Sequence, residues 1–294
     1  MIGLGSAFDE TAYLAANADV SEAVRDGRMA SGWEHFFRHG YAEQRRGGPV
    51  VNPQSRLGQF LKKTALPYSP PEALRKRVHG VHVSSFSSVG RSCAFDIFVG
   101  LEREGRSLDA GARVLDFGAG CGRVAMWLHE LYPEAALYGT DIDAEAIGWA
   151  RDNLASVGKF NVNPSNPPMR YADGCFDFVY SVSVFTHLPE QMQFEWLQEL
   201  RRITKPGGIL FLTTHGADLM LNHPNFGNLA KADFITKGFH YQVGNGTDGL
   251  PDFYQDAYHS ERYIKDRWSE FFKIRRIIKR GMNSHQDIVV CERT

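Results

Sequence analysis

The chain has 294 residues, of which 43% are hydrophobic, and its 33 basic and 34 acidic side chains leave a formal net charge of −1. Such a chain can bury a core without disulfide or metal support, which excludes general disorder. The balanced charge argues against a nucleic-acid partner, because nonspecific binding to nucleic acid needs a strong positive field.

Residues 1–46 are predicted to form a helical N-terminal appendage. Their apolar side chains recur at helical spacing, and Gly27, Ser31 and Gly40 separate two or three short helices. The segment that begins at Phe8 has the form FD-x-x-x-YL-x-x-N-x-DV and resembles short segments attached to various bacterial enzymes. Oligomer contact, substrate recognition and docking of a protein partner all stay open as its role.

Residues 47–73 are rich in proline and glycine, so we expect a linker with one short helix over Leu57–Lys63. The main domain, residues 74–294, alternates strands with helices, which is the pattern of a parallel sheet covered on both faces. The expected strands are Arg113–Phe117, Ala136–Thr140, Phe160–Val162, Phe176–Ser183 and Gly208–Thr213. The expected helices are Arg123–Leu131, Ala144–Val157 and Gln191–Thr204.

The C-terminal segment FFKIRRIIKR-GMNSH-QDIVVCER is typical of two strands joined by a short connection, which are therefore antiparallel. The predicted fold class is α/β, with a doubly wound, seven-stranded, mostly parallel sheet, an antiparallel C-terminal hairpin and an N-terminal helical segment. The basic side chains that alternate with isoleucines in FFKIRRIIKR are typical of an edge strand protected by charge.

A glycine-rich turn follows the first predicted strand, in the sequence VLDFGAGCGRV. Glycines allow otherwise strained dihedral angles and a close approach to a ligand, and the next helix offers free amide groups. The turn lies at the carboxyl end of a strand, where open α/β sheets bind ligands. Asp141, at the end of the next strand, is placed to accept from both hydroxyls of a ribose. Asp116, just before the turn, is placed to orient the turn or to receive an ammonium group.

The spacing of the glycines distinguishes between adenosine-containing ligands. A dinucleotide turn, G-x-G-x-x-G, would need glycine where this chain has Arg123. The chain instead has G-x-G-x-G. With an acid before and after it, this turn resembles that of the class I methyltransferases that use S-adenosylmethionine (SAM). The resemblance continues in Asp173–Tyr180 and Leu200–Gly208.

The resemblance implies a seven-stranded fold, SAM as the methyl donor and S-adenosylhomocysteine as the product. By carry-over, the methionine half of SAM would lie on the glycines, and the ribose on Asp141. Asn163 and Ile142 are the candidates beside the adenine ring, although Ile142 also suits a core position. The predicted cofactor residues are Asp116, Gly118, Gly120, Gly122, Asp141, Ile142 and Asn163.

Methyl transfer from SAM is an in-line displacement, so the protein must align an acceptor atom behind the methyl group. An alcohol acceptor must also lose a proton, and histidine is a base with a pKa near neutrality. His187 follows the fourth predicted strand and His215 the fifth, so both are candidate catalytic residues at the functional edge of the sheet. The alternatives are a structural role for His187 and a turn cap for His215.

Residues 217–262 are predicted to form a lid over the substrate, since long insertions of this kind often cover such sites. Polar side chains at Asp252, Gln255 and His259 suit hydroxyl groups. Aromatic side chains suit an apolar wall, at Phe239, Tyr241, Phe253, Tyr254 and Tyr258. The expected function is O-methylation of a sugar, a glycan or an oxygenated bacterial metabolite. The lack of an Asn/Asp-Pro-Pro-Tyr/Phe motif after strand four, which amino-methylating relatives often carry, favours oxygen.

Three alternatives stay open: N-methylation of a small molecule or peptide, a nicotinamide-dependent oxidoreductase, and a SAM-binding scaffold without catalysis. No metal is expected, because the four cysteines are widely spaced and no histidine cluster has metal-ligand spacing. Reduced thiols, no secretory signal and no apolar run of membrane-spanning length predict a cytoplasmic protein. The expected partner is a small-molecule or glycan acceptor, and a homo-oligomer or a protein partner on the N-terminal helices stays open.

Overall fold

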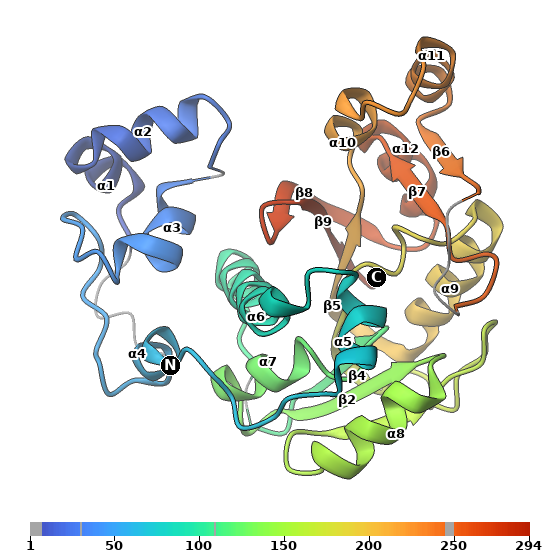
Figure 1. Ribbon diagram of the computed structural model, residues 1–294, viewed down its shortest axis with the longest axis horizontal. Helices are drawn as coiled ribbons and strands as arrows, with labels where there is room; N and C mark the ends of the chain where they lie inside the picture. Colours follow the sequence, from blue (N-terminus) through green and yellow to red (C-terminus); the bar gives the residue numbers. More distant parts are fainter. Residues whose placement is uncertain (1–7, 30, 109, 245–249) are drawn as a thin grey trace.

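The computed structural model describes residues 8–29, 31–108, 110–244 and 250–294; residues 1–7 of the predicted appendage and 245–249 of the predicted lid lie outside the described residues. A seven-stranded sheet forms the centre of the molecule, in the order β3-β2-β1-β4-β5-β9-β8 (Figure 1). β1 to β5 run parallel, and β9 and β8 pair antiparallel, so the predicted fold class is confirmed. The strands are β1 (Arg113–Phe117), β2 (Ala136–Asp141), β3 (Lys159–Val162), β4 (Phe176–Ser181), β5 (Thr204–Thr214), β8 (Lys273–Met282) and β9 (Gln286–Glu292).

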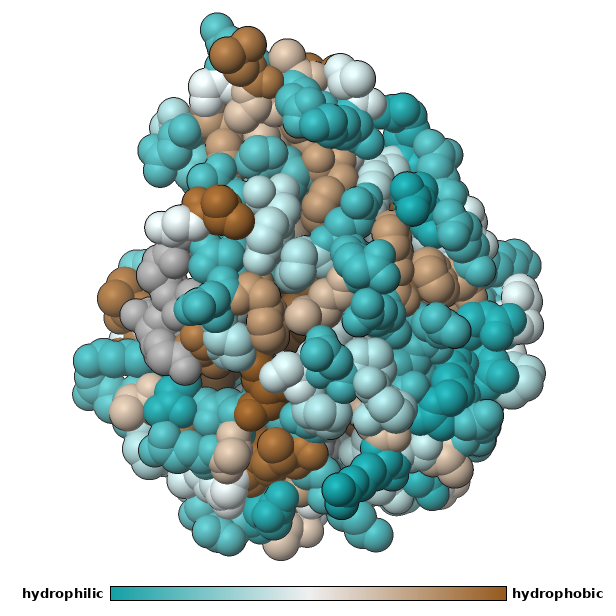
Figure 2. Space-filling model, turned by 90° about the vertical axis from the view of Figure 1, so that its right-hand side faces the viewer, coloured by the Kyte–Doolittle hydropathy of each residue, from teal (hydrophilic) through white to brown (hydrophobic). Residues whose placement is uncertain are grey.

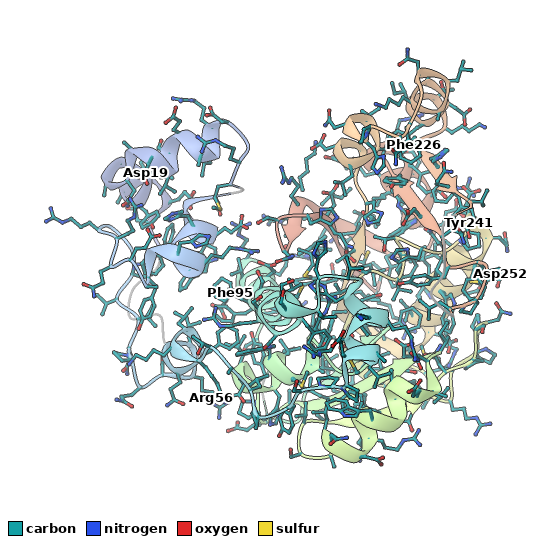
Figure 3. All side chains as sticks on the ribbon, viewed as in Figure 1. Asp19, Arg56, Phe95, Phe226, Tyr241 and Asp252 are labelled. Carbon is teal, nitrogen blue, oxygen red and sulfur yellow. The ribbon has the colours of Figure 1, made fainter. Side chains whose placement is uncertain are left out.

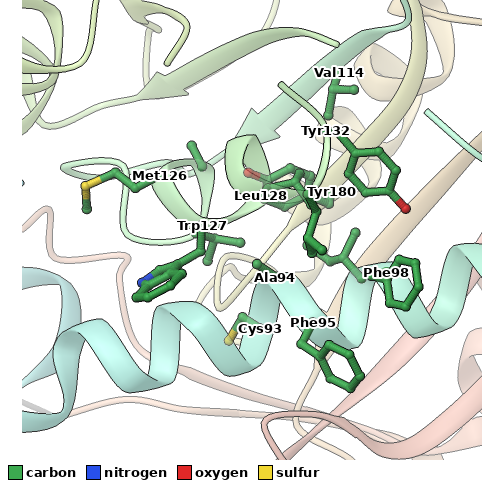
Figure 4. Packing of buried hydrophobic residues seen from close by; sticks show 14 of the residues in the cluster. Cys93, Ala94, Phe95, Phe98, Val114, Met126, Trp127, Leu128, Tyr132 and Tyr180 are labelled. Atoms are coloured by element: carbon green, nitrogen blue, oxygen red, sulfur yellow. The ribbon is translucent and has the colours of Figure 1, made fainter. Parts of the chain in front are cut away.

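Helices cover both faces of this sheet because successive strand residues point to opposite faces. Val114 packs with α6 (Phe86–Arg103), α7 (Ala125–Leu131) and α8 (Ala144–Asn153). Leu115, the next residue, packs with α9 (Glu190–Ile203), α12 (Glu261–Arg267) and the short helix η3 (Trp268–Glu270). Figure 4 shows Val114 in one buried cluster with Phe98 of α6 and Leu128 of α7. The predicted α/β alternation therefore produces two apolar layers.

The segment predicted as a lid has a small core of its own. It contains α10 (Ala217–Asn222), α11 (Asn228–Lys237), β6 (Phe239–Gln242) and β7 (Asp256–His259). β6 and β7 form a separate antiparallel pair, which the sequence analysis does not predict. Phe226 and Phe234 pack with Met220 and Tyr258 in this core, and Figure 3 places Phe226 among the lid elements at the upper right.

The N-terminal appendage consists of α1 (Glu10–Ala16), α2 (Ala18–Arg25), α3 (Gly32–His35) and η1 (Phe36–Gly40). The residues of its FD-x-x-x-YL-x-x-N-x-DV pattern fix these helices to one another. Asp9 caps α1 by accepting from the Ala12 amide at 2.9 Å, and the Tyr13 hydroxyl bonds to His35 Nδ1 at 2.8 Å. Asn17 donates to the carbonyl of Tyr13 at 2.8 Å and, at 2.9 Å, to that of Arg46.

Three further helices join the appendage to β1. α4 (Arg56–Lys62) confirms the short helix expected in the linker, while α5 (Glu72–His79) and η2 (Val83–Ser85) lead into α6. Phe37 of the appendage packs on Phe95, which lies on the side of α6 that faces the appendage (Figure 3). Within the described residues, no helix combines the length and the apolarity that crossing a bilayer requires.

A buried cluster of charges anchors the appendage to the main domain. Arg38 of η1 pairs with Glu34, with 2.9 Å between Nε and Oε1, and with Asp96 of α6. The same two carboxylates bind the turn between β8 and β9. The Asn283 amide donates to Asp96 Oδ2 at 2.6 Å, and the Ser284 hydroxyl donates to Glu34 Oε1 at 3.0 Å. The appendage, α6 and the hairpin turn therefore meet at one cation.

Replacing Arg38 with methionine should lower the free energy of unfolding by about 3–5 kcal/mol, because two buried carboxylates would lose their cation. Urea denaturation followed by circular dichroism measures this loss. Arg25→Met is the matched control, since that side chain is 73% exposed beside Glu22 and Asp26 and should contribute less than about 1 kcal/mol. Equal losses in the two variants would contradict a buried anchor.

Candidate active site

A pocket lies at the carboxyl ends of β1, β2 and β4, where the strand order reverses between β1 and β4. Residues 116–120 of the glycine turn and residues 141–143 after β2 line it. α5 covers it with Arg77 and Val78, and the lid contributes Phe253 and Tyr254. The site therefore combines sheet edge, N-terminal segment and lid.

Three hydrogen bonds tie the glycine turn to the end of β2. The amides of Gly118 and Ala119 donate to the Thr140 carbonyl at 2.8 and 3.0 Å, and the Gly120 amide donates to Asp141 Oδ2 at 2.8 Å. Gly118 has a φ of +85°, and a Cβ there would lie 2.2 Å from the Val184 side chain. A side chain at this position would be both strained and obstructed.

The third glycine of the motif has a different position. Gly122 is not among the residues that line the pocket, and a Cβ added to it would lie 2.5 Å from the Leu154 side chain. The resemblance assigned Gly122 to the methionine half of SAM, whereas in the structure it allows the turn to pack closely on the core.

The predicted nucleoside residues Asp141, Ile142 and Asn163 all line the pocket. Asp141 Oδ1 accepts from the Asp143 amide at 2.9 Å, so each carboxylate oxygen holds one backbone amide and keeps a lone pair for a ribose hydroxyl. Burial raises the pKa of Asp141. The Asn163 side chain accepts from the Thr140 hydroxyl at 2.8 Å and donates to its neighbour's carbonyl at 2.7 Å, which fixes this wall of the pocket.

Two buried residues of opposite charge also line the pocket. Asp116 accepts a hydrogen bond from the Tyr180 hydroxyl at 2.8 Å, and burial raises its pKa to about 7. Arg123 is 7% exposed; its Nη1 donates to Nδ1 of His79 at 2.7 Å, and its Nε has no hydrogen-bond partner among the described residues. A buried guanidinium that donates to a neutral ring, as that of Arg123 donates to His79, requires an anion to stabilise its charge. Asp116 and Arg123 therefore fit the ammonium and carboxylate groups of the methionine half of SAM.

Sequence reasoning missed the cover that α5 provides. Arg77 donates to Asp143 and to Glu145, both at 2.7 Å, and so holds α5 across the pocket. Asp143 lies 66 residues from Arg77, and no local pattern marks such a pair. From the sequence, Arg123 served only to exclude a dinucleotide turn. A positive charge inside a ligand-binding turn could also have predicted that the turn binds an anionic group.

The two predicted catalytic histidines lie together, with their ring centroids 6.0 Å apart. Neither lines the cofactor pocket; Tyr254 does, and its ring stacks on His187 at 4.1 Å. His187 Nδ1 is 2.9 Å from the Gln255 carbonyl oxygen, so this nitrogen carries the proton and Nε2 keeps its lone pair. Asp256 Oδ1 lies 3.5 Å from the same nitrogen. Burial lowers the pKa of His215 to about 3 and keeps this ring neutral.

The lid residues expected to bind hydroxyl groups do not all face the site. His259 is 1% exposed and its Nε2 bonds to Gln193 at 2.9 Å, so it belongs to the interior of the domain, which corrects the prediction. Phe239 likewise stacks on Tyr263. Phe253 and Tyr254, by contrast, line the cofactor pocket.

Residues 115–212 match a family model described as a methyltransferase domain. The methyltransferase GfsG of Streptomyces halstedii is 31% identical over 108 residues, which cover 35% of this chain and 37% of that protein. The malonyl-acyl-carrier-protein O-methyltransferase 1 of Coxiella burnetii is 34% identical over 107 residues, covering 36% of this chain and 35% of that protein. A crystal structure of a Pyrococcus horikoshii protein has a TM-score of 0.53 at 15% identity and covers 77% of this chain and 100% of that one.

The chain thus carries a class I, SAM-dependent methyltransferase domain, as its motifs predicted. The alignments span little more than a third of these two curated relatives' own lengths, so they identify the domain and leave the methyl acceptor open. In the part of the chain that the structure describes, no group of three or more His, Cys, Asp or Glu side chains is arranged to hold a metal ion.

Binding of S-adenosylhomocysteine should weaken about tenfold from pH 8 to pH 6. With a pKa of about 7, Asp116 is mostly protonated at pH 6, and only its ionised form stabilises an ammonium group, so affinity rises as the pH rises through 7. Isothermal titration calorimetry measures this. Asp116→Asn should remove the pH dependence of binding. The control Asp141→Asn should weaken binding at both pH values and should keep the pH dependence. An unchanged slope in Asp116→Asn would contradict the assignment.

Proposed function

We propose that this protein transfers the methyl group of SAM to a hydroxyl oxygen of a sugar, a glycan or another small oxygenated metabolite in the cytoplasm. The observation that carries this proposal is the 2.9 Å contact between His187 Nδ1 and the Gln255 carbonyl oxygen. The Nδ1–H of His187 is committed to this carbonyl, which leaves Nε2 as a base beside the cofactor pocket. An alcohol needs such a base, because a neutral hydroxyl is a poor nucleophile until it loses its proton.

In the proposed reaction, His187 takes the proton of the acceptor hydroxyl at Nε2 as the oxygen attacks. Asp256, 3.5 Å from Nδ1, stabilises the imidazolium that forms. When bound, SAM supplies a methyl carbon already activated by a sulfonium, and the electron pair of the broken carbon–sulfur bond stays on sulfur. Asp116, Arg123 and Asp141 hold the donor in place, so their part in catalysis is alignment.

His215 has a different part in this proposal. Burial lowers its pKa to about 3, so it stays neutral and is a weak proton acceptor at physiological pH. It therefore suits a hydrogen bond to the acceptor molecule better than removal of the reacting proton. Of the two histidines predicted from sequence, His187 is the stronger candidate for the base.

Surface properties support a small acceptor over a macromolecule. The face in Figure 2 is mostly hydrophilic, and its hydrophobic areas are separate patches. Most basic side chains of edge strand β8 are in ion pairs: Arg275 lies 2.6 Å from Glu104, and Lys279 lies 3.4 Å from Glu261. This strand therefore offers few of the unpaired cations that a phosphate backbone attracts.

The curated relatives support the type of chemistry more than the acceptor. The Coxiella protein is named as an O-methyltransferase, whereas a relative from Hahella chejuensis is named as a ribosomal RNA methyltransferase. Mass spectrometry of metabolites and glycans from cells with and without the gene, searching for products that lack one methylene unit, tests the proposed acceptor class. Labelled methyl groups found on nitrogen or on RNA would overturn it.

His187→Ala should lower methyl transfer from tritiated SAM into a cell extract by about 10²–10⁴-fold, because the general base is lost. Calorimetry should show unchanged affinity for S-adenosylhomocysteine. His39→Ala, an exposed histidine of the appendage, is the control and should keep full transfer. Full transfer by His187→Ala would refute the base assignment, and no transfer by the wild-type protein would favour a binding protein without catalysis.

A further inference from the structure

Ser183 connects the cofactor pocket to a second group of polar residues. It lines the pocket, and it adopts a left-handed conformation with a φ of +63°, which is uncommon for a residue with a side chain. Its amide donates to the Thr213 hydroxyl at 2.8 Å, and its hydroxyl accepts from Gln286 Nε2 at 2.7 Å. Residues from β5 and β9 thus hold Ser183 in this position.

The group behind Ser183 contains polar atoms that lack a partner. Gln286 is 8% exposed, and its Oε1 is buried without a hydrogen bond among the described residues. If the oxygen and nitrogen of the Gln286 amide are exchanged, the nitrogen takes the buried position without a partner. Either assignment therefore leaves one polar atom of this side chain unsatisfied. Nδ1 of His215 is also buried without a described partner.

Continuing the register of β5 and β9 by one residue places these two unpartnered groups opposite each other. β5 and β9 pair antiparallel with Thr214 opposite Asp287, so His215 and Gln286 are the next residues on each side. Side chains alternate along a strand, which puts His215 on the same face as Thr213, the residue that holds Ser183. Directly opposite side chains in such a pair begin about 5 Å apart. Two unsatisfied groups in one place point to a ligand group that forms a hydrogen bond with each of them.

We propose that Gln286 and His215 bind a second hydroxyl of the methyl acceptor, adjacent to the hydroxyl that His187 deprotonates, so that the acceptor is a vicinal diol. This inference rests on the proposed function. A hydroxyl suits both groups because it donates one hydrogen bond and accepts another, as an amide and a neutral imidazole require. The His187 and His215 rings, 6.0 Å apart, are close enough to bind two hydroxyls on adjacent carbons of one ligand.

The test compares cis-1,2-cyclohexanediol with cyclohexanol, using protein saturated with S-adenosylhomocysteine and ligand-observed NMR titration. The wild-type protein should bind the diol about tenfold more tightly or better, because buried polar groups left unpaired penalise the mono-alcohol. Gln286→Leu should reduce this preference to about twofold or less. Gln286→Glu, which keeps an acceptor oxygen, should restore it.

Thr214→Val is the matched control. Its hydroxyl is also buried without a described partner, but it lies on the opposite face of the same strand, so the variant should keep the wild-type preference. No preference in the wild-type protein, including no measurable binding of either probe, or an unchanged preference in Gln286→Leu, would overturn the proposal. Because the readout is binding, it is separate from a failure of methyl transfer, and loss of S-adenosylhomocysteine binding would instead count against the proposed function.

Discussion

The carboxylate of Asp141 accepts hydrogen bonds from the amides of Gly120 and Asp143, and the rest of the pocket depends on this pair of bonds. They join the turn after β1 to the turn after β2, at the place where the strand order reverses. Burial alone would favour the protonated acid, and the two amides oppose that effect by stabilising the charge. The two backbone amides therefore fix the orientation of the Asp141 carboxylate without a ligand. The lone pairs that remain free already point in fixed directions.

The predicted lid connects this pocket to His187 through a single short segment. Tyr254 lines the pocket and stacks on His187, and the next residue, Gln255, exchanges two hydrogen bonds with His187. Farther on, the Ala257 amide donates to the Thr186 carbonyl at 2.7 Å. Backbone hydrogen bonds thus join the lid segment to the loop after β4. The same segment therefore lines the cofactor pocket at Tyr254 and holds His187 through Gln255.

Local patterns in the sequence were sufficient for the sheet and for the glycine turn. Strand periodicity and glycine spacing are properties of neighbouring residues, and they predicted β1, the turn and Asp141. Contacts between distant segments were not predictable in this way. The sequence placed His259 among the lid side chains that suit hydroxyl groups, but Gln193, 66 residues away, binds it in the interior. The cover formed by α5 was missed for the same reason, since Arg77 shows no pattern until Asp143 lies beside it.

The surroundings of Gln286 are also built from distant parts of the chain. Asn283 and Ser284 are the central residues of the turn between β8 and β9, in which the His285 amide donates to the Met282 carbonyl, and their φ values are +51° and +53°. Serine rarely adopts this conformation, and such backbone persists only where surrounding contacts over-determine it. Those contacts are present, because Asp96 binds the Asn283 amide and Glu34 of the appendage binds the Ser284 hydroxyl. Gln286 follows two residues after this turn, so the N-terminal appendage helps to set where its side chain meets Ser183.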